Sequence, residues 1–228
     1  RYVKSLSEDR DWRRIETARA AQPFESMDDF TRRTGLDDRV IRRLAEAGAF
    51  AGFRGERRAA LWEAQGLGRT PATPLRIAPR EPLPDFEPLT QFQTISWDYA
   101  FSGHSTHGHP LGPLREALTA QRLPDAQTVA TMRDGQRVRY AGLVICRQRP
   151  GTASGVTFMT LEDETGFVNL VIWKQVFDDY AVLARTASFL GVTGTLQADS
   201  GVVHLIADAL WTPEIATRPA TAGSRDFH

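Results

Sequence analysis

Residues 137–149, RVRYAGLVICRQR, open the stretch that decides the fold of this 228-residue chain. They are rich in β-branched and aromatic residues, which predicts a strand. Five such segments follow one another: 137–149, 156–161, 167–173, 189–196 and 202–210. Turn-forming Gly, Pro, Asp and Ser separate the first three, over 150–155 and 163–166. Residues 174–185 change to a helical period, so they predict one helix between the third and fourth strands.

The resulting order, β-β-β-α-β-β, matches the five-stranded Greek-key OB barrel. Barrels of this kind bind single-stranded nucleic acid or oligosaccharide on an exposed strand face and its adjoining loops. Side chains alternate along a strand, and Gly142 suits the bend that a small barrel needs. We therefore expect inward side chains at Val138, Tyr140, Gly142, Val144 and Cys146, and outward ones at Arg139, Leu143, Ile145 and Arg147.

Outward arginines beside apolar residues are typical of single-strand binders, in which guanidinium groups meet phosphates while bases stack on apolar side chains. The residues predicted for this face are Arg139, Leu143, Arg147, Arg149, Met159, Phe167 and Trp173. The same apolar residues are equally typical of a face covered by a helix or a neighbouring domain. The barrel carries about as many acidic as basic residues, so no basic footprint decides between the two interpretations.

The composition is that of a globular protein, with 41% hydrophobic and 25% charged residues. A formal net charge of +0 means that any contact with nucleic acid must come from a local arrangement of groups. No apolar run suits a membrane span and no signal peptide is evident, so we expect a cytoplasmic protein without a membrane partner. The single cysteine, Cys146, fits that setting as a core residue. A first residue other than Met predicts a piece of a longer protein.

Residues 1–68 contain four short helical patterns; the first three start at the capping residues Ser5, Ser26 and Asp37, and the last three stop at glycines. Joined by tight turns, they predict a tandem helix-hairpin-helix region. Hairpins can hold duplex DNA through backbone amides and nearby cations, without reading sequence. The predicted DNA contacts are Lys4, Ser5, Arg42, Arg43 and Gly48, in the turns around 4–6 and 47–49. Paired arginines are also typical of an ordinary solvated helix face, because acidic neighbours nearly balance them.

The rest of the chain supplies the boundaries. Residues 69–95 are rich in proline and predict a linker, 96–134 a connecting helical segment, 135–212 the OB domain and 213–228 a flexible tail. The fold class is thus multidomain α+β. His104, His107 and His109 lie close together in the connecting segment and invite a metal site, but their spacing is not a zinc signature. We predict turn contacts for them, with no metal and no catalytic residue in this chain.

Several of these stretches resemble the error-prone, ImuC-type branch of the bacterial C-family DNA polymerases. Residues 147–152 (RQRPGT) and 158–166 (FMTLEDETG) are similar to the family's barrel motif, and 201–205 (GVVHL) to its last strand. Residues 98–110 resemble the segment before the barrel, and 24–50 the tandem hairpins. The resemblance implies the C-terminal, DNA-binding part of a polymerase in DNA repair and damage-induced translesion synthesis, with hairpins on duplex DNA and the barrel on single-stranded template.

The departures from the family also carry expectations. Ser5 stands where such hairpins usually carry glycine. No clamp-binding peptide of the Gln-x-x-Leu/Phe type is evident, so we expect a sliding clamp to be contacted only indirectly, through accessory translesion proteins. The metal-binding aspartates of a polymerase palm are missing from this segment. We therefore expect that a palm outside the segment binds Mg²⁺ and carries out nucleotidyl transfer, and that the segment itself binds no cofactor. The alternative function is a module that docks accessory translesion proteins.

Overall fold

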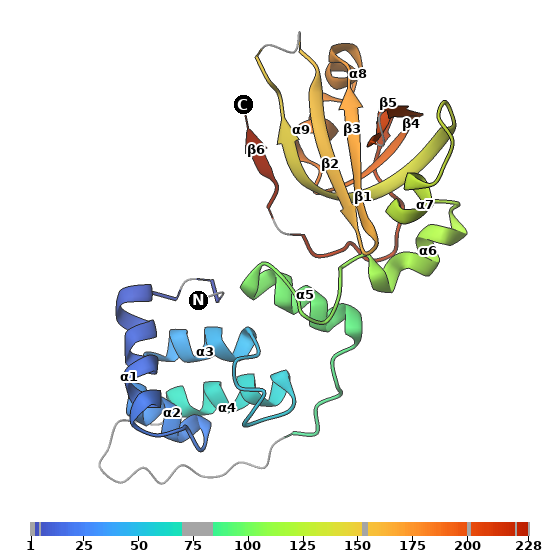
Figure 1. The fold of residues 1–228 in the computed structure, drawn as a ribbon. Helices are drawn as coiled ribbons and strands as arrows, with labels where there is room; N and C mark the ends of the chain where they lie inside the picture. The colour runs from blue at the N-terminus through green and yellow to red at the C-terminus, as the bar shows by residue number, and fades with distance from the viewer. Residues whose placement is uncertain are drawn as a thin grey trace. The chain divides into compact units, whose positions relative to one another are not determined.

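The computed structural model describes residues 3–4, 6–69, 84–151, 155–199, 202–221 and 223–227. The chain divides into two compact units, Arg1–Ser105 and Thr106–His228 (Figure 1). Each unit has its own hydrophobic core. No helix within the described ranges is both long and apolar enough to cross a bilayer. Much of the predicted proline-rich linker, residues 70–83, lies outside them.

The first unit is helical. Its elements are η1 (Glu8–Trp12), a π-helical turn that continues into α1 (Arg13–Ala21), then α2 (Met27–Thr34), α3 (Asp38–Glu46), α4 (Arg57–Arg69) and α5 (Gln91–Ser102). Side-chain caps start α2 and α3, because Ser26 accepts from the amide of Asp29 and Asp37 from that of Val40. Gly35, left-handed at φ 57°, ends α2. The helices up to α4 confirm the predicted helix-hairpin-helix region, and the cap predicted at Ser5 lies outside the described residues.

Aromatic rings fill the centre of this unit. Phe24 meets Phe30 edge-on, with 4.8 Å between ring centroids, and Phe30 meets Phe50 at 5.1 Å. The other buried members of the cluster come from α1 to α4 and the turn after α2: Ile15, Met27, Leu36, Val40, Ile41, Leu44, Ala45, Ala60 and Ala64. Each large side chain removed from water in this way stabilises the unit by about 1.5–3 kcal/mol.

Helix α5 belongs to the same unit. Arg57 of α4 forms an ion pair with Asp98 of α5 at 2.5 Å, and the two side chains are only 11% and 9% exposed. Ser105 donates to the second carboxylate oxygen of Asp98 at 2.6 Å. The division between units therefore falls after Ser105, inside the 96–134 segment that was predicted to connect the domains.

The second unit is built on a closed barrel. Its strands are β1 (Arg137–Gln148), β2 (Thr157–Asp163), β3 (Gly166–Ile172), β4 (Phe189–Asp199) and β5 (Val202–Trp211). They pair in the order β1-β2-β3-β5-β4-β1, with β3 and β5 parallel and the other pairs antiparallel. Two short helices, α8 (Lys174–Asp179) and α9 (Ala181–Thr186), take the place of the one predicted between β3 and β4. The predicted five-stranded OB barrel is confirmed.

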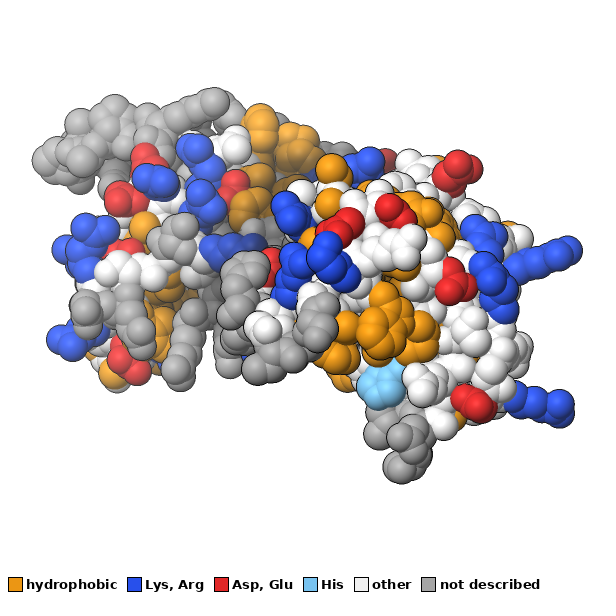
Figure 2. Space-filling view, turned by 90° about the horizontal axis from the view of Figure 1, so that it is seen from above, with side chains coloured by type: hydrophobic (Ala, Val, Ile, Leu, Met, Phe, Trp, Pro, Cys, Tyr) orange, Lys and Arg blue, Asp and Glu red, His pale blue; other side chains and the backbone are white. Residues whose placement is uncertain are grey.

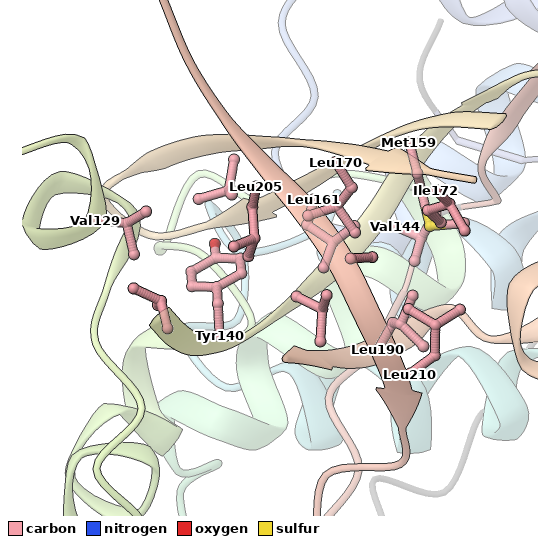
Figure 3. Packing of buried hydrophobic residues seen from close by; sticks show 14 of the residues in the cluster. Val129, Tyr140, Val144, Met159, Leu161, Leu170, Ile172, Leu190, Leu205 and Leu210 are labelled. Atoms are coloured by element: carbon pink, nitrogen blue, oxygen red, sulfur yellow. The ribbon is translucent and has the colours of Figure 1, made fainter. Parts of the chain in front are cut away.

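Alternate side chains of all five strands fill the barrel. Figure 3 shows Leu205 beside the ring of Tyr140, which is fully buried, and Leu161 and Leu170 further along the same cluster. Phe177 of α8 and Ala184 of α9 belong to the same cluster. The helices between β3 and β4 therefore pack against the barrel core, as their apolar stripe predicts.

A β-bulge in β1 reverses the facing of the residues that follow it. Val144 pairs with Leu161 of β2, but Cys146 pairs with the next residue, Thr160, so Ile145 is the extra residue. Because one inserted residue moves all later side chains to the opposite face, Arg147 lies on the side of its core partner Met159. The inward prediction for Cys146 and the outward one for Arg147 are therefore wrong, whereas Val138, Tyr140 and Val144 do point into the core.

Asp163 joins the segment before the barrel to the barrel itself. That segment contains η2 (Gly112–Leu114), α6 (Arg115–Ala120) and α7 (Ala126–Ala130). The buried Asp163 carboxylate accepts from the Ala126 amide at 2.7 Å, from Arg115 at 3.2 Å and from the Tyr140 hydroxyl at 3.1 Å. Its other oxygen accepts from the amide and hydroxyl of Thr165. One carboxylate thereby satisfies donors from four places in the sequence.

Within residues 213–228, predicted as a tail, the structure places a short sixth strand, β6 (Arg225–Phe227). It runs parallel to β1, with Cys146, Arg147 and Gln148 opposite Arg225, Asp226 and Phe227. Figure 1 shows β6 beside the barrel. The sequence signal for β6 is weak, because three residues are too few to show a strand period.

Candidate nucleic-acid interface

The outer face of β2 and β3 carries two exposed aromatic side chains, Phe158 at 38% and Phe167 at 61% exposure. They are outward because their strand neighbours Met159 and Val168 are core residues. Phe158 lies opposite Val171 and Phe167 opposite Glu162, so the two rings are four residues apart along the paired strands, roughly 13 Å. Two separate bases can therefore stack on this face, one on each ring.

Polar side chains lie between and beside the two rings. Thr160 and Asn169 form the pair midway, joined by a 3.0 Å hydrogen bond from the Thr160 hydroxyl. Asn169 lies opposite His204 of β5. Gln148 of β1 lies beside Phe158 on the other side. Flat aromatic surfaces flanked by hydrogen-bonding groups suit a single strand of nucleic acid, whose bases offer both a π-face and polar edges.

The electrostatics of the face are mixed. Burial raises the pKa of the Glu162 carboxyl, and the neighbouring charge of Asp163 adds to the effect. Figure 2 shows Lys and Arg side chains interspersed with Asp and Glu on the side of the molecule seen there, together with a patch of hydrophobic side chains next to a histidine. The charge needed to hold phosphates must therefore come from individual arginines.

Of the arginines predicted for the face, Arg147 is engaged elsewhere. Its guanidinium donates to the carbonyl of Ala184 at 2.8 Å and to that of Ala187, and to the Ser224 hydroxyl at 2.5 Å. The side chain is 12% exposed. Because of the β1 bulge it points away from Phe158 and Phe167, which corrects its prediction as a phosphate contact.

Arg139 and Arg149 each cover an aromatic ring. The Arg139 guanidinium lies 4.6 Å from the centroid of Trp211, on the half of β1 that pairs with β4. Phe158 and Phe167 lie on β2 and β3, so the structure does not bring Arg139 to them. Arg149 directly follows Gln148, the partner of Phe158, and lies 4.6 Å from the ring centroid of Phe177. Arg149 is half-buried over this ring, which belongs to the barrel core.

Of the apolar residues predicted for the face, some are exposed there and others are buried. Phe167 is exposed on the face, and Trp173, at 55% exposure, directly precedes α8 where β3 ends. Met159 and Leu143, in contrast, are 2% and 4% exposed. Met159 is a core residue, so its prediction as a stacking surface is corrected. Sequence reasoning missed Phe158, although the strand alternation that puts Leu161 inside puts Met159 inside and Phe158 outside.

The hairpin region offers amides and arginines in a different arrangement from the predicted one. The amides of Ala47, Gly48 and Ala49 donate to carbonyls of α3, those of Arg43, Ala45 and Leu44 respectively. Gly48 is left-handed at φ 78° and closes the helix end. These three amides are therefore not available to phosphate oxygens, which corrects the prediction for the turn at Gly48.

Lys4 is also engaged within its unit. Its ammonium donates to the carbonyls of Tyr99 and Ala100, both at 2.9 Å, and its amide to that of Phe101. Lys4 thus satisfies carbonyls near the end of α5. Ser5 lies outside the described residues.

A cavity of about 310 Å³ lies between η1 and the start of α3. It is lined by Ser7, Arg10, Asp11, Asp37, Arg39, Val40 and Arg43. Asp11 pairs with Arg10 at 3.0 Å, and Asp37 caps α3. Within the part of the chain that the structure describes, the side chains of Arg39 and Arg43 make no hydrogen bond or ion pair. The structure thus brings Arg43 to the cavity beside Arg39, which the sequence did not single out, whereas Arg42 is an exposed residue of α3.

Two of the three histidines, His104 and His109, lie in turn contacts. Nδ1 of His109 accepts from the Leu111 amide at 3.1 Å, and burial lowers the pKa of the imidazole. Nδ1 of His104 lies 3.2 Å from the carbonyl of Ser102. Among the described residues, no group of three or more His, Cys, Asp or Glu is placed to hold a metal ion.

Comparison with known families assigns both units. Residues 138–212 match the OB-fold nucleic acid binding domain, and residues 1–60 match the helix-hairpin-helix motif. The asparaginyl-tRNA synthetase of Pyrococcus horikoshii is 25% identical in the superposed part, which covers 45% of this chain and 24% of the synthetase, with a TM-score of 0.35.

Curated relatives match the whole chain. The error-prone DNA polymerase of Pseudomonas paraeruginosa is 41% identical over 231 residues, which cover 100% of this chain and 22% of the polymerase. That of Methylococcus capsulatus is 40% identical over 223 residues, 94% of this chain and 20% of the polymerase. The chain thus spans about a fifth of the length of the relatives it matches. It belongs to the error-prone DNA polymerases and contains a helix-hairpin-helix motif and an OB-fold nucleic acid binding domain.

Proposed function

We propose that this chain is the DNA-binding portion of an error-prone DNA polymerase that acts in DNA repair and damage-induced translesion synthesis. In this proposal the OB barrel holds the single-stranded template and the hairpin unit holds duplex DNA. Nucleotidyl transfer needs carboxylates that hold two metal ions. In this proposal a separate palm region provides those carboxylates and binds the Mg²⁺.

The observation that carries the proposal is the pair of exposed rings, Phe158 and Phe167, on neighbouring strands of the barrel. Exposing two phenyl rings to water is unfavourable unless a ligand covers them, and the hydrogen-bonding side chains between these rings suit such a ligand. Stacking of bases on aromatic rings is sequence-tolerant, because every base has a π-face. A polymerase that copies any template needs that tolerance.

Duplex binding is supported by the cavity between η1 and α3. Arg39 and Arg43 line it without an ion-pair partner among the described residues, and the amino end of α3 faces the same space. Guanidinium groups and a helix amino end both favour phosphate. Neither group reads bases, so the expected binding has no sequence preference.

Docking of accessory translesion proteins is the second candidate function. It is favoured by Val182 of α9, which is 75% exposed, and by Trp173 at the start of α8. Any contact with a sliding clamp would then run through these proteins. This function predicts that Val182→Asp abolishes co-purification with a translesion partner and leaves DNA affinity unchanged.

Titrating the whole chain against two labelled probes, a single-stranded oligothymidylate and a blunt DNA duplex, tests the proposal. We expect both to bind, with affinities that fall as salt rises. Replacing Arg39 and Arg43 together by Ala should weaken binding of the duplex and spare the single strand, while the exposed pair Arg13 and Arg19 serves as the matched control. If the chain binds neither probe better than a neutral control protein at low salt, the proposed function is wrong.

A further inference from the structure

The short strand β6 widens the outer face of the barrel. The half of β1 that pairs with β2 has β6 on its other edge, so β6, β1, β2 and β3 lie side by side. In parallel strands, residues opposite each other point to the same side of the sheet. Arg225 lies opposite Cys146, which lies opposite Thr160, which lies opposite Asn169. Arg225 is therefore in line with the polar pair midway between Phe158 and Phe167.

The next residue of β6 holds the strand in place from the other side. Asp226 lies opposite Arg147, and their side chains form an ion pair at 3.4 Å. Arg147 also donates to the Ser224 hydroxyl, which in turn donates to Asp226 at 2.8 Å. Arg147 is fixed in turn by the carbonyls of Ala184 and Ala187. The bulge that turns Arg147 away from the face thereby makes it the anchor of β6.

The side chain of Arg225 is exposed, and within the described part of the chain its guanidinium makes no hydrogen bond or ion pair. Its nearest acidic neighbour along the strand, Asp226, points to the opposite side and is paired with Arg147. Two other arginines of the described strands are engaged, since Arg147 is anchored and Arg139 covers Trp211. Strand β6 thus places an exposed cation beside the face.

We infer that Arg225 of β6 binds a backbone phosphate of the single strand that stacks on Phe158 and Phe167. The inference rests on the proposed single-strand function of the barrel. It assigns β6 as a functional part of the binding face, with Arg147 as the residue that positions it.

The test compares four forms of the whole chain: unchanged, Arg225→Ala, Arg218→Ala and a form lacking residues 223–228. Arg218 is the matched control, because it is an exposed arginine of the segment before β6 and lies outside every strand. The probe is a fluorescein-labelled oligothymidylate, and Kd is measured over a range of salt concentrations. Melting temperatures of the four forms show whether each is folded.

We expect Arg225→Ala to raise Kd roughly three- to tenfold and to lower the salt slope by about 0.7, the loss of one phosphate contact with a single strand. Arg218→Ala should match the unchanged chain, and the shortened form should bind no better than Arg225→Ala. If the unchanged chain binds and Arg225→Ala matches Arg218→Ala in both Kd and slope, the inference is wrong and the proposed function stands. If the unchanged chain does not bind the probe, both are wrong.

Discussion

At the scale of single residues, Asp163 is the group on which the second unit depends most. It is fully buried and accepts hydrogen bonds from the segment before the barrel, from β1 and from the β2–β3 turn. Burial raises the pKa of its partner Tyr140, and the charge of Asp163 adds to this, so the phenol remains a donor. Such a carboxylate is favourable only while all its donors are present.

Replacing Asp163 by Ala should therefore lower the free energy of unfolding by about 3–5 kcal/mol, because Arg115 and four other donor groups lose their buried acceptor. Urea denaturation of the whole chain measures the loss. Asp208→Ala is the control: its ion pair with Arg137 is exposed, and we expect a loss of less than about 1 kcal/mol. Equal losses in the two variants would contradict the role of Asp163.

Glu162 makes the free energy of unfolding of the chain depend on pH. Its pKa is raised above the ordinary 4.5 by burial and by Asp163, so the folded chain holds this proton to higher pH than the unfolded chain does. The stability gained from the protonated form is present below pH 4.5 and is lost as pH rises through the raised pKa.

Glu162→Gln should therefore gain stability relative to the unchanged chain as pH rises from about 4 to about 7. The variant should also bind the single-stranded probe more tightly at neutral pH, because a negative charge beside Phe167 is removed. Urea titrations at several pH values measure the first effect, with the exposed Glu214→Gln as control. A stability difference that does not change with pH would contradict the pKa argument.

At the scale of elements, strands β4 and β5 approach each other so closely at one point that only glycine fits between them. Gly194 lies where the β4–β5 register shifts, and a Cβ there would overlap the carbonyl of Ile206. Gly194→Ala should therefore cost about 1–3 kcal/mol of unfolding free energy, as other overpacked sites do. Gly151→Ala, where no atom lies within 4 Å of the new Cβ, should be nearly neutral. Thermal unfolding distinguishes the two, and an unaffected Gly194→Ala would show that the strands can separate at no cost.

The elements also show how far sequence reasoning reaches. Each strand of the barrel was predicted close to its observed bounds, because apolar alternation and turn residues are local signals. The side of the sheet on which Cys146 and Arg147 lie was predicted wrongly, because a bulge inserts one residue into a strand without leaving a signal in the composition. The prediction that the amides at Gly48 contact phosphate was wrong for a related reason. Whether a backbone amide is free to bind a ligand depends on the three-dimensional path of the chain after the helix.

At the scale of the whole molecule, a formal charge of +0 must be reconciled with a nucleic-acid partner. The structure does so locally, with exposed rings on the barrel face and unpaired arginines at the hairpin cavity. Sequence alone supplied the fold and the family, since both depend on patterns along the chain. It supplied only part of the candidate site, Phe167, because burial and bulges decide which side chains stay on a face.

The central claim is that single-stranded DNA stacks on Phe158 and Phe167, and the most direct measurement is the Kd of the oligothymidylate for the double variant Phe158→Ala/Phe167→Ala. Each lost stacking contact is worth about 1–3 kcal/mol, so the loss of two should raise Kd at least roughly thirtyfold, with an unchanged melting temperature because both rings are exposed. Val182→Ala, which removes an exposed apolar side chain elsewhere, should leave Kd unchanged. A double variant that binds the probe as tightly as Val182→Ala does would contradict the claim.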